Sequence, residues 1–229
     1  MGVQRRKQTA KDGRRWSDYG RTASLIRQGR FIDHIICVSG PETLMKETIT
    51  TRDGDQFDVE VEQPANAIRT VLFAAGRGGS PDRHHGLINA LANHRCAVVA
   101  PHFDMMPPIP SSADLFARMN RIKSAIDALH RPDRPVVGIG HSIGATILLL
   151  LSGVEGWTKG GMEHLSVQRE IEFEKLLLLA PALDFFPDPR ALEPVVARVW
   201  FWLGRKDEMV PVAKVEAMQA NARPGQEVG

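Results

Sequence analysis

Cysteines, aromatic residues and long apolar runs are scarce in this sequence of 229 residues. With only Cys37 and Cys96, the chain cannot build the multi-bridge framework of a small secreted protein. A reducing, cytoplasmic location is therefore expected. The longest apolar run, 145–151, is far shorter than the roughly 20 residues that cross a bilayer, so we expect no membrane span.

Acidic residues are scarce at the start of the chain. Residues 1–30 hold nine Lys or Arg and only two Asp, a local charge of +7, whereas the whole chain carries +2. The remainder is therefore mildly acidic, which argues against a nucleic-acid groove built into the fold. We expect residues 1–40 to form a poorly ordered basic leader. Contact with an anionic surface and organelle targeting are the alternatives for this segment.

The length allows one substantial core, so a single domain is expected over residues 41–229. Phe57, Val59 and Val61 alternate with polar residues after the turn-like Asp53-Gly54 pair. This pattern predicts a half-exposed strand in an antiparallel hairpin at a sheet edge. Continuous apolar runs, typical of strands buried on both faces, follow at 70–75, 96–100, 135–139, 176–180 and 198–203.

Helical segments separate these runs, and the clearest lies between Ala113 and His130. Its apolar residues step by four, three, four and three, which predicts one stripe against a sheet. They are Leu115, Met119, Ile122, Ile126 and Leu129. Alternation of strand and helix predicts the α/β class, with a mostly parallel central sheet flanked by helices on both faces. Such sheets place their chemistry at the carboxyl ends of the strands.

The segment 153–174 breaks this alternation, because glycines and polar residues surround Trp157 and Met162. We interpret it as a small lid over the active-site mouth. An ordinary surface loop and helix is the alternative.

The pentapeptide Gly140-His141-Ser142-Ile143-Gly144 joins a short apolar strand to an apolar helix. That is the context of a nucleophile elbow, a sharp turn that exposes a strained serine. Only small residues fit two positions before and two after such a serine, and glycine stands at both. Chance occurrence is the alternative interpretation.

Two further motifs follow predicted strands. The first is the Gly-rich segment 74–80, AAGRGGS, whose glycines allow the backbone to approach a substrate. Phosphate binding is the alternative for such a loop, but the Lys-Ser/Thr of a P-loop and the GxGxxG helix start are absent. The second is GRKDEMVP at 204–211, in which Asp207 also suits a turn residue that caps the following helix.

These three motifs together resemble the α/β-hydrolases from about residue 42 onward, with a lean toward the dienelactone-hydrolase-like and small esterase branches. The resemblance implies Ser142 as nucleophile and Asp207 as the acid of the triad, with Glu208 as its neighbouring substitute. It implies that backbone N–H groups of Arg77 and Ile143 form the oxyanion hole. A small-molecule acyl substrate is implied, with no metal and no organic cofactor.

The same resemblance places the catalytic base after Asp207, but no histidine follows His164. Residues 223–229 are expected to form a coil, so the last strand, the C-terminal helix and the base are missing at their usual places. We interpret the chain as a truncated or altered hydrolase whose last strand exposes its edge. A relocated base is the alternative, with His84, His85, His102 and His141 as candidates.

Three functions are consistent with the sequence. The first is a serine hydrolase that cleaves ester, thioester or related acyl bonds through an acyl-Ser142 intermediate. A hydrolase-like binding or scaffold protein is the second, favoured by the missing base. The third is an acyltransferase that uses the same serine. The sequence identifies neither the substrate nor the oligomeric state.

Overall fold

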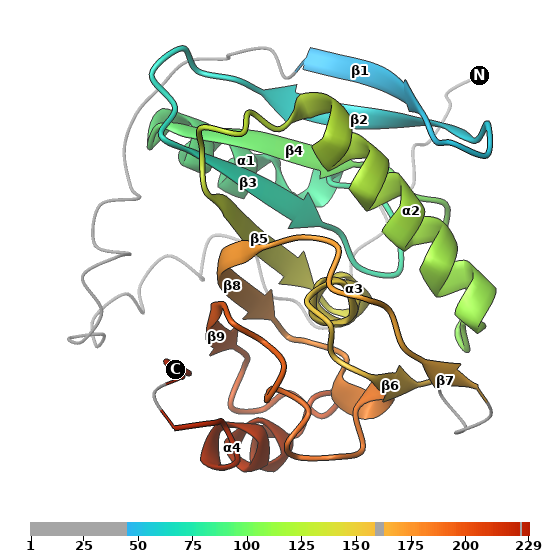
Figure 1. Cartoon of the computed structure of the whole chain (residues 1–229), viewed down its shortest axis with the longest axis vertical. Helices are drawn as coiled ribbons and strands as arrows, with labels where there is room; N and C mark the ends of the chain where they lie inside the picture. Colours follow the sequence, from blue (N-terminus) through green and yellow to red (C-terminus); the bar gives the residue numbers. More distant parts are fainter. Residues whose placement is uncertain (1–44, 159–162, 225) are drawn as a thin grey trace, which may run out of the picture. The chain divides into compact units, whose positions relative to one another are not determined.

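The computed structural model describes residues 45–158, 163–224 and 226–229, so the predicted basic leader lies outside the described residues. A seven-stranded sheet with the order β1-β2-β4-β3-β5-β8-β9 forms its centre (Figure 1). The strands are β1 (Met45–Thr50), β2 (Gln56–Glu62), β3 (Arg69–Ala74), β4 (Cys96–Pro101), β5 (Val136–His141), β8 (Phe173–Leu179) and β9 (Arg198–Trp202). The helices are α1 (His85–Asn93), α2 (Ser112–Leu129), α3 (Ile143–Leu151) and α4 (Val212–Ala220), with 3₁₀ turns η2 (Asp82–His84) and η3 (Leu183–Phe185).

The strand directions confirm the predicted mixed sheet. β4, β3, β5, β8 and β9 run parallel, whereas β2 pairs antiparallel with both β1 and β4. The predicted edge hairpin is thus β1 and β2, joined at the Asp53-Gly54 turn, where Gly54 takes a φ of 91°. All five apolar runs fall on parallel strands, so their carboxyl ends share one sheet edge.

Helices cover both faces of the sheet, as the alternation predicts. Ile88 of α1 packs on one face against Val71 and Phe73 of β3. α2 and α3 pack on the other face, where Ile122 and Leu148 join Leu72 in the larger core cluster. Figure 1 shows α2 and α3 in front of the sheet and α1 behind it.

α2 and α3, the two helices on the larger core cluster, are stabilised in different ways. α2 begins with a capping box, in which the Ser111 hydroxyl accepts from the Asp114 N–H and the Asp114 carboxylate accepts from the Ser111 N–H. α3 lacks polar residues except Thr146, and every residue from Ile143 to Leu151 is buried. Burial therefore fixes the position of α3, and with it the position of the turn that precedes it.

The last residues of the chain correct one expectation. The described residues of 223–229 form no helix or strand, as expected, but we also expected the edge of the last strand to be exposed. Instead, the N–H groups of Val199 and Phe201 donate to the carbonyls of Glu227 and Gly229. Val228 forms a parallel bridge with Val199. The outer edge of β9 is thus partly paired rather than exposed, because its N–H groups find acceptors in this segment.

The described parts of segment 153–174 differ from both a plain loop and a helix. β6 (Gly156–Trp157) and β7 (His164–Leu165) form a two-stranded antiparallel sheet of their own. Within the described residues, no helix is long and apolar enough to cross a membrane.

Replacement of Leu148 by Ala tests the packing of α3. Leu148 is fully buried, so the Leu148→Ala variant should lose about 2–5 kcal/mol of unfolding free energy in a urea titration. The control Ile109→Ala removes a side chain that is 68% exposed, so a change within about 0.5 kcal/mol is expected. Equal losses in the two variants would contradict a core built on α3.

Candidate active site

Ser142 stands between β5 and α3 with φ 53° and ψ −121°. A positive φ is uncommon for a residue with a side chain, and it costs of order 1–3 kcal/mol that the surrounding structure must offset. The Ser142 N–H donates to the Leu179 carbonyl of β8 (2.9 Å), and its carbonyl accepts from the Ala145 N–H (3.0 Å). The strained turn is therefore held on both sides, as a nucleophile elbow requires.

The glycines on either side of Ser142 are required by close backbone approach. A Cβ on Gly140 would lie 2.5 Å from the Cα of Ala145, and a Cβ on Gly144 would overlap the carbonyl oxygen of Ala74 at the end of β3. Neither neighbour is the tip of a flexible side chain, so neither can move aside cheaply. The sequence argument for small residues at both positions thus has a direct structural cause.

The loop after β3 lies beside this turn. Since Gly144 approaches the Ala74 carbonyl, the first turn of α3 and the start of segment 76–79 are neighbours. Ile143 begins α3, so its N–H has no acceptor within the helix. The Arg77 side chain turns away to the next loop, where its Nε donates to the Met106 carbonyl (2.7 Å).

Arg118 of α2 holds the carbonyl groups of this loop. Its Nη1 donates to the Gly76 carbonyl (2.8 Å), and its Nη2 donates to the carbonyls of Arg77 (2.8 Å) and Asp104 (2.6 Å). Arg118 is buried, and burial lowers its pKa to about 10, partly opposed by the Asp104 carboxylate. The guanidinium therefore stays charged at neutral pH and makes strong, charge-assisted hydrogen bonds.

Those contacts fix a peptide plane. The carbonyl of Gly76 and the N–H of Arg77 belong to one planar trans peptide, so they point in opposite directions. Since Arg118 holds the Gly76 carbonyl, the Arg77 N–H points away from Arg118. Sequence reasoning missed Arg118, because an arginine inside an amphipathic helix pattern looks like a solvent-facing residue.

Asp207 follows β9 and is half-buried. Its Oδ1 accepts from the N–H groups of Met209 (2.9 Å) and Val210 (3.1 Å), which confirms the turn role foreseen from the sequence. Oδ2 has no hydrogen bond among the described residues. The carboxylate is thus oriented through one oxygen and can accept a hydrogen bond on the other.

Ser142 and Asp207 lie at the same sheet edge but not in contact. β8 separates the strands that precede them, and strand spacing sets the separation of β5 and β9 at roughly 10 Å. The Ala180 N–H donates to the Trp202 carbonyl (2.7 Å), which joins the ends of β8 and β9.

None of the four candidate histidines hydrogen-bonds to the Ser142 hydroxyl within the described ranges. His141 and His84 contact each other, with ring centroids 5.2 Å apart. Burial lowers the pKa of His141, and burial followed by the charge of His141 lowers that of His84, so both rings favour the neutral form. His85 and His102 both contact the buried carboxylate of Glu60 instead.

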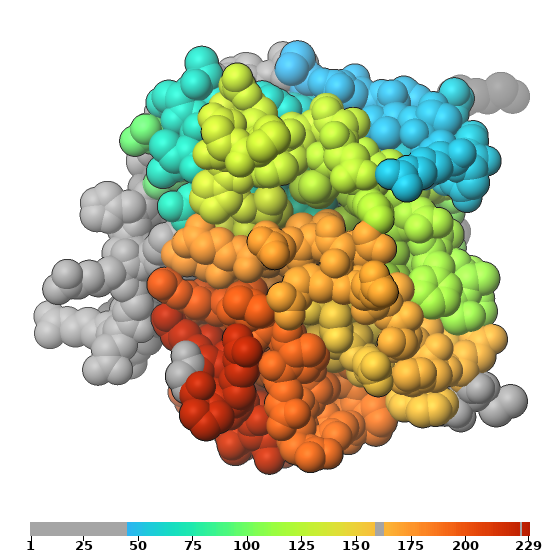
Figure 2. Space-filling view, viewed as in Figure 1, coloured from blue at the N-terminus to red at the C-terminus, as the bar shows by residue number. Residues whose placement is uncertain are grey.

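The small β6–β7 hairpin lies near the same edge. The Ser112 N–H, at the start of α2, donates to the Glu163 carboxylate (2.9 Å), and Gly156 lies against the Phe185 carbonyl beyond β8. Figure 2 shows the gold and orange hairpin segment against the green segment that begins α2. The segment interpreted as a lid is therefore at the carboxyl edge of the sheet.

Comparison with solved structures finds esterases. The chain aligns with an esterase from Pyrococcus furiosus at 16% identity, covering 84% of this chain and 87% of that one, with a TM-score of 0.60. An esterase domain from a Rhodothermus marinus protein aligns at 14% identity, covering 82% and 86%, with a TM-score of 0.58. Esterase 2 of Thermogutta terrifontis, phosphoramylated by tabun, aligns at 15%, covering 81% and 80%, with a TM-score of 0.54. No protein-family model and no curated protein sequence matches the chain.

This chain has the α/β-hydrolase fold. The mixed seven-stranded sheet, its strand directions and its flanking helices match those esterase structures, which confirms the predicted fold class. Identities this low establish the fold, so the activity has to be argued from the residues at the sheet edge.

Replacement of Gly144 tests the elbow. The Gly144→Ala variant should be destabilised by about 3 kcal/mol or more in thermal or urea unfolding, because its methyl group meets backbone that is locked in β3. The matched control is Gly86→Ala in α1, where a Cβ has open space and alanine gains up to about 1 kcal/mol of helix propensity. Equal stability of the two variants would show that the close approach to Ala74 is absent.

Proposed function

We propose that this chain is a serine hydrolase acting on ester, thioester or related acyl bonds, with Ser142 as nucleophile. The observation that carries the proposal is the strained backbone of Ser142 between two glycines that permit close approach. Strain of this kind persists where it exposes a reacting group. A fold that is shared with esterases supports the same conclusion.

In the proposed reaction, the Ser142 oxygen attacks the acyl carbon and the carbonyl oxygen becomes an oxyanion. The N–H groups of Arg77 and Ile143 would donate to that oxyanion, each worth about 3 kcal/mol of the barrier. Collapse expels the leaving group and forms the acyl-serine, which water then hydrolyses. Asp207 would orient the base that takes the serine proton and stabilise its charged form.

A second function, ligand binding without turnover, is favoured by one observation. The Ser142 hydroxyl has no base as hydrogen-bond partner among the described residues. A serine without a base is a weak nucleophile. The two functions therefore differ in whether Ser142 is activated.

Labelling with a fluorophosphonate separates the two functions. Attack by Ser142 forms an oxygen–phosphorus bond and releases fluoride, so an activated serine gives one stable adduct in intact-protein mass spectrometry. We expect rapid labelling of the chain, none of Ser142→Ala, and unchanged labelling of the control Ser166→Ala, which alters an exposed serine. No adduct on a chain shown to be folded by circular dichroism would support the binding function.

Arg118→Lys tests whether Arg118 positions the loop after β3, which carries the proposed oxyanion donor Arg77. Lysine keeps the charge but cannot hold three carbonyls in the fork geometry of a guanidinium. With the Gly76–Arg77 peptide released, we expect the labelling rate to fall by roughly 10²-fold, the usual effect of losing one oxyanion donor.

The matched control is Arg121→Lys on the same helix. Arg121 pairs with the carboxylates of Asp55 and Asp104 rather than with the loop carbonyls of Gly76 and Arg77. Its replacement should leave the labelling rate close to that of the unaltered chain. A similar fall in both variants would mean that Arg118 acts through general stability, not through the loop.

A further inference from the structure

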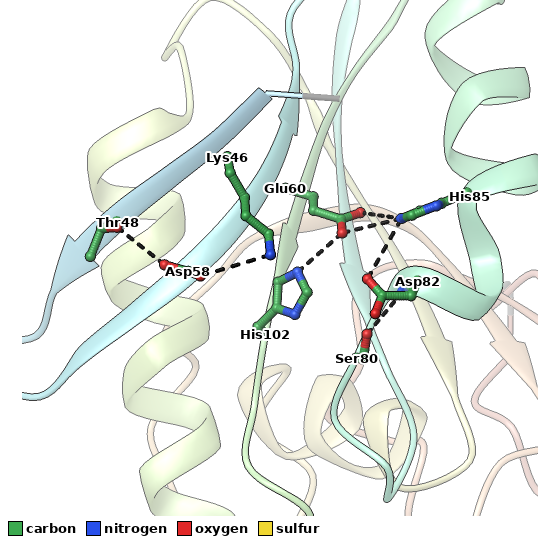
Figure 3. A network of polar contacts seen from close by, with 8 residues as sticks. All are labelled: Lys46, Thr48, Asp58, Glu60, Ser80, Asp82, His85 and His102. Atoms are coloured by element: carbon green, nitrogen blue, oxygen red, sulfur yellow. Dashed lines mark hydrogen bonds and ion pairs between the residues drawn. The ribbon is translucent and has the colours of Figure 1, made fainter. Parts of the chain in front are cut away.

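A second group of polar side chains lies on the α1 side of the sheet. It comprises Glu60 of β2, Asp82 of η2, His85 of α1 and His102, which follows β4 (Figure 3). Nε2 of His85 lies 3.1 and 3.0 Å from the two Glu60 oxygens and 3.7 Å from Oδ1 of Asp82. Nε2 of His102 lies 3.1 Å from Oε1 of Glu60. Three separate segments of the chain thus meet at one point, since Asp82 and His85 lie one turn apart.

The burial of the Glu60 carboxylate needs an explanation. Its side chain is only 4% exposed, and a buried carboxylate is costly unless it is paired with a positive charge or bound to a metal. Within the described residues its ion-pair partners are His85 and His102, with no lysine or arginine.

The donor set and its spacing suit a transition-metal ion. Ligand atoms of Glu60, Asp82 and His85 all lie within 4.8 Å of one another. Zinc binds nitrogen and carboxylate oxygen at about 2.0–2.2 Å, so tetrahedral ligand atoms stand about 3.3–3.6 Å apart. The observed distances of 3.0 and 3.7 Å from Nε2 of His85 bracket that value. A mixture of imidazole and carboxylate favours zinc over magnesium or calcium, which prefer oxygen alone.

We propose that Glu60, Asp82 and His85 bind one Zn²⁺ ion, and that His102 orients Glu60 as its hydrogen-bond partner. Three protein ligands leave one coordination position for water or another donor. A ligating carboxylate held by a neighbouring imidazole is a common supporting arrangement in metal sites. Binding exchanges the Nε2 proton of His85 for the metal ion, and the proton leaves to solvent.

Such an ion would fasten the loop that carries the proposed oxyanion donor. Asp82 follows that loop directly, and its N–H donates to the Ser80 hydroxyl (3.1 Å). The Phe103 N–H, one residue beyond His102, donates to the Gly79 carbonyl (2.9 Å). Zinc at this point would join β2, η2, α1 and the end of β4, and so would hold this loop in place from the α1 side.

Zinc binding to the chelator-treated, full-length chain tests the proposal directly. We expect one tightly bound Zn²⁺ per chain by dialysis and elemental analysis, and intense visible absorption from tetrahedral Co²⁺ in its place. At a hundredfold excess over Kd, zinc should raise Tm by roughly 5 °C or more, whereas magnesium should not. Asp82→Asn and His85→Gln should each weaken zinc binding by at least about tenfold.

The variants are chosen so that misfolding cannot imitate the result. The Asp82 side chain is 61% exposed, so Asp82→Asn leaves the core intact, and circular dichroism checks both variants. The matched control is His164→Gln, which alters an exposed histidine that pairs with Glu155 and should leave zinc binding unchanged. Zinc binding that is equal in the unaltered chain and in Asp82→Asn and His85→Gln would overturn the proposal, as would no bound zinc in the unaltered chain. The readout involves no turnover, so failure of the proposed hydrolase activity would leave the zinc result standing.

Discussion

The geometry of this sheet edge depends on one close approach between backbones. The first turn of α3 lies so near the end of β3 that position 144 admits only glycine. That approach brings the start of α3, with its unpaired N–H groups, beside the loop that begins at Gly76. Because α3 is buried along its whole length, the helix cannot shift to relieve the contact. The strain at Ser142 is thus maintained by core packing, which is where the free energy to offset it comes from.

Two buried charges hold the loop after β3 from its two sides. On the α2 side, Arg118 donates to the carbonyls of Gly76 and Arg77, which also accept from the N–H groups of Gly79 and Met106. On the α1 side, Glu60 contacts His85 and His102, and Asp82, at the start of η2 after the loop, contacts His85. The loop is therefore held by a guanidinium that binds its carbonyls and by a carboxylate cluster at the residues that follow it.

The sequence predicted the parts of this arrangement that are local. The elbow, the parallel strands and the stripe of α2 are each encoded by spacing within one segment, and the structure has them at nearly the same bounds. Glu60 could not be foreseen, because it occupies a polar position in an alternating edge strand and looks like a solvated residue. Only the packing of η2 and α1 over β2 buries it. The pairing of Val228 with β9 was missed for a similar reason, since a short polar tail has no periodicity and the partner strand supplies its structure.

Whether Ser142 is activated depends on whether a base can act between Ser142 and Asp207. Two strand spacings separate the strands that precede them, β5 and β9. Asp207 commits Oδ1 to the N–H groups of its own turn, which fixes the direction of Oδ2. Its role in this turn and its proposed role as an orienting acid are therefore compatible, because each uses a different oxygen. His85 and His102 contact Glu60, and His84 packs against His141, so among the described residues none of the four candidate histidines hydrogen-bonds to the Ser142 hydroxyl.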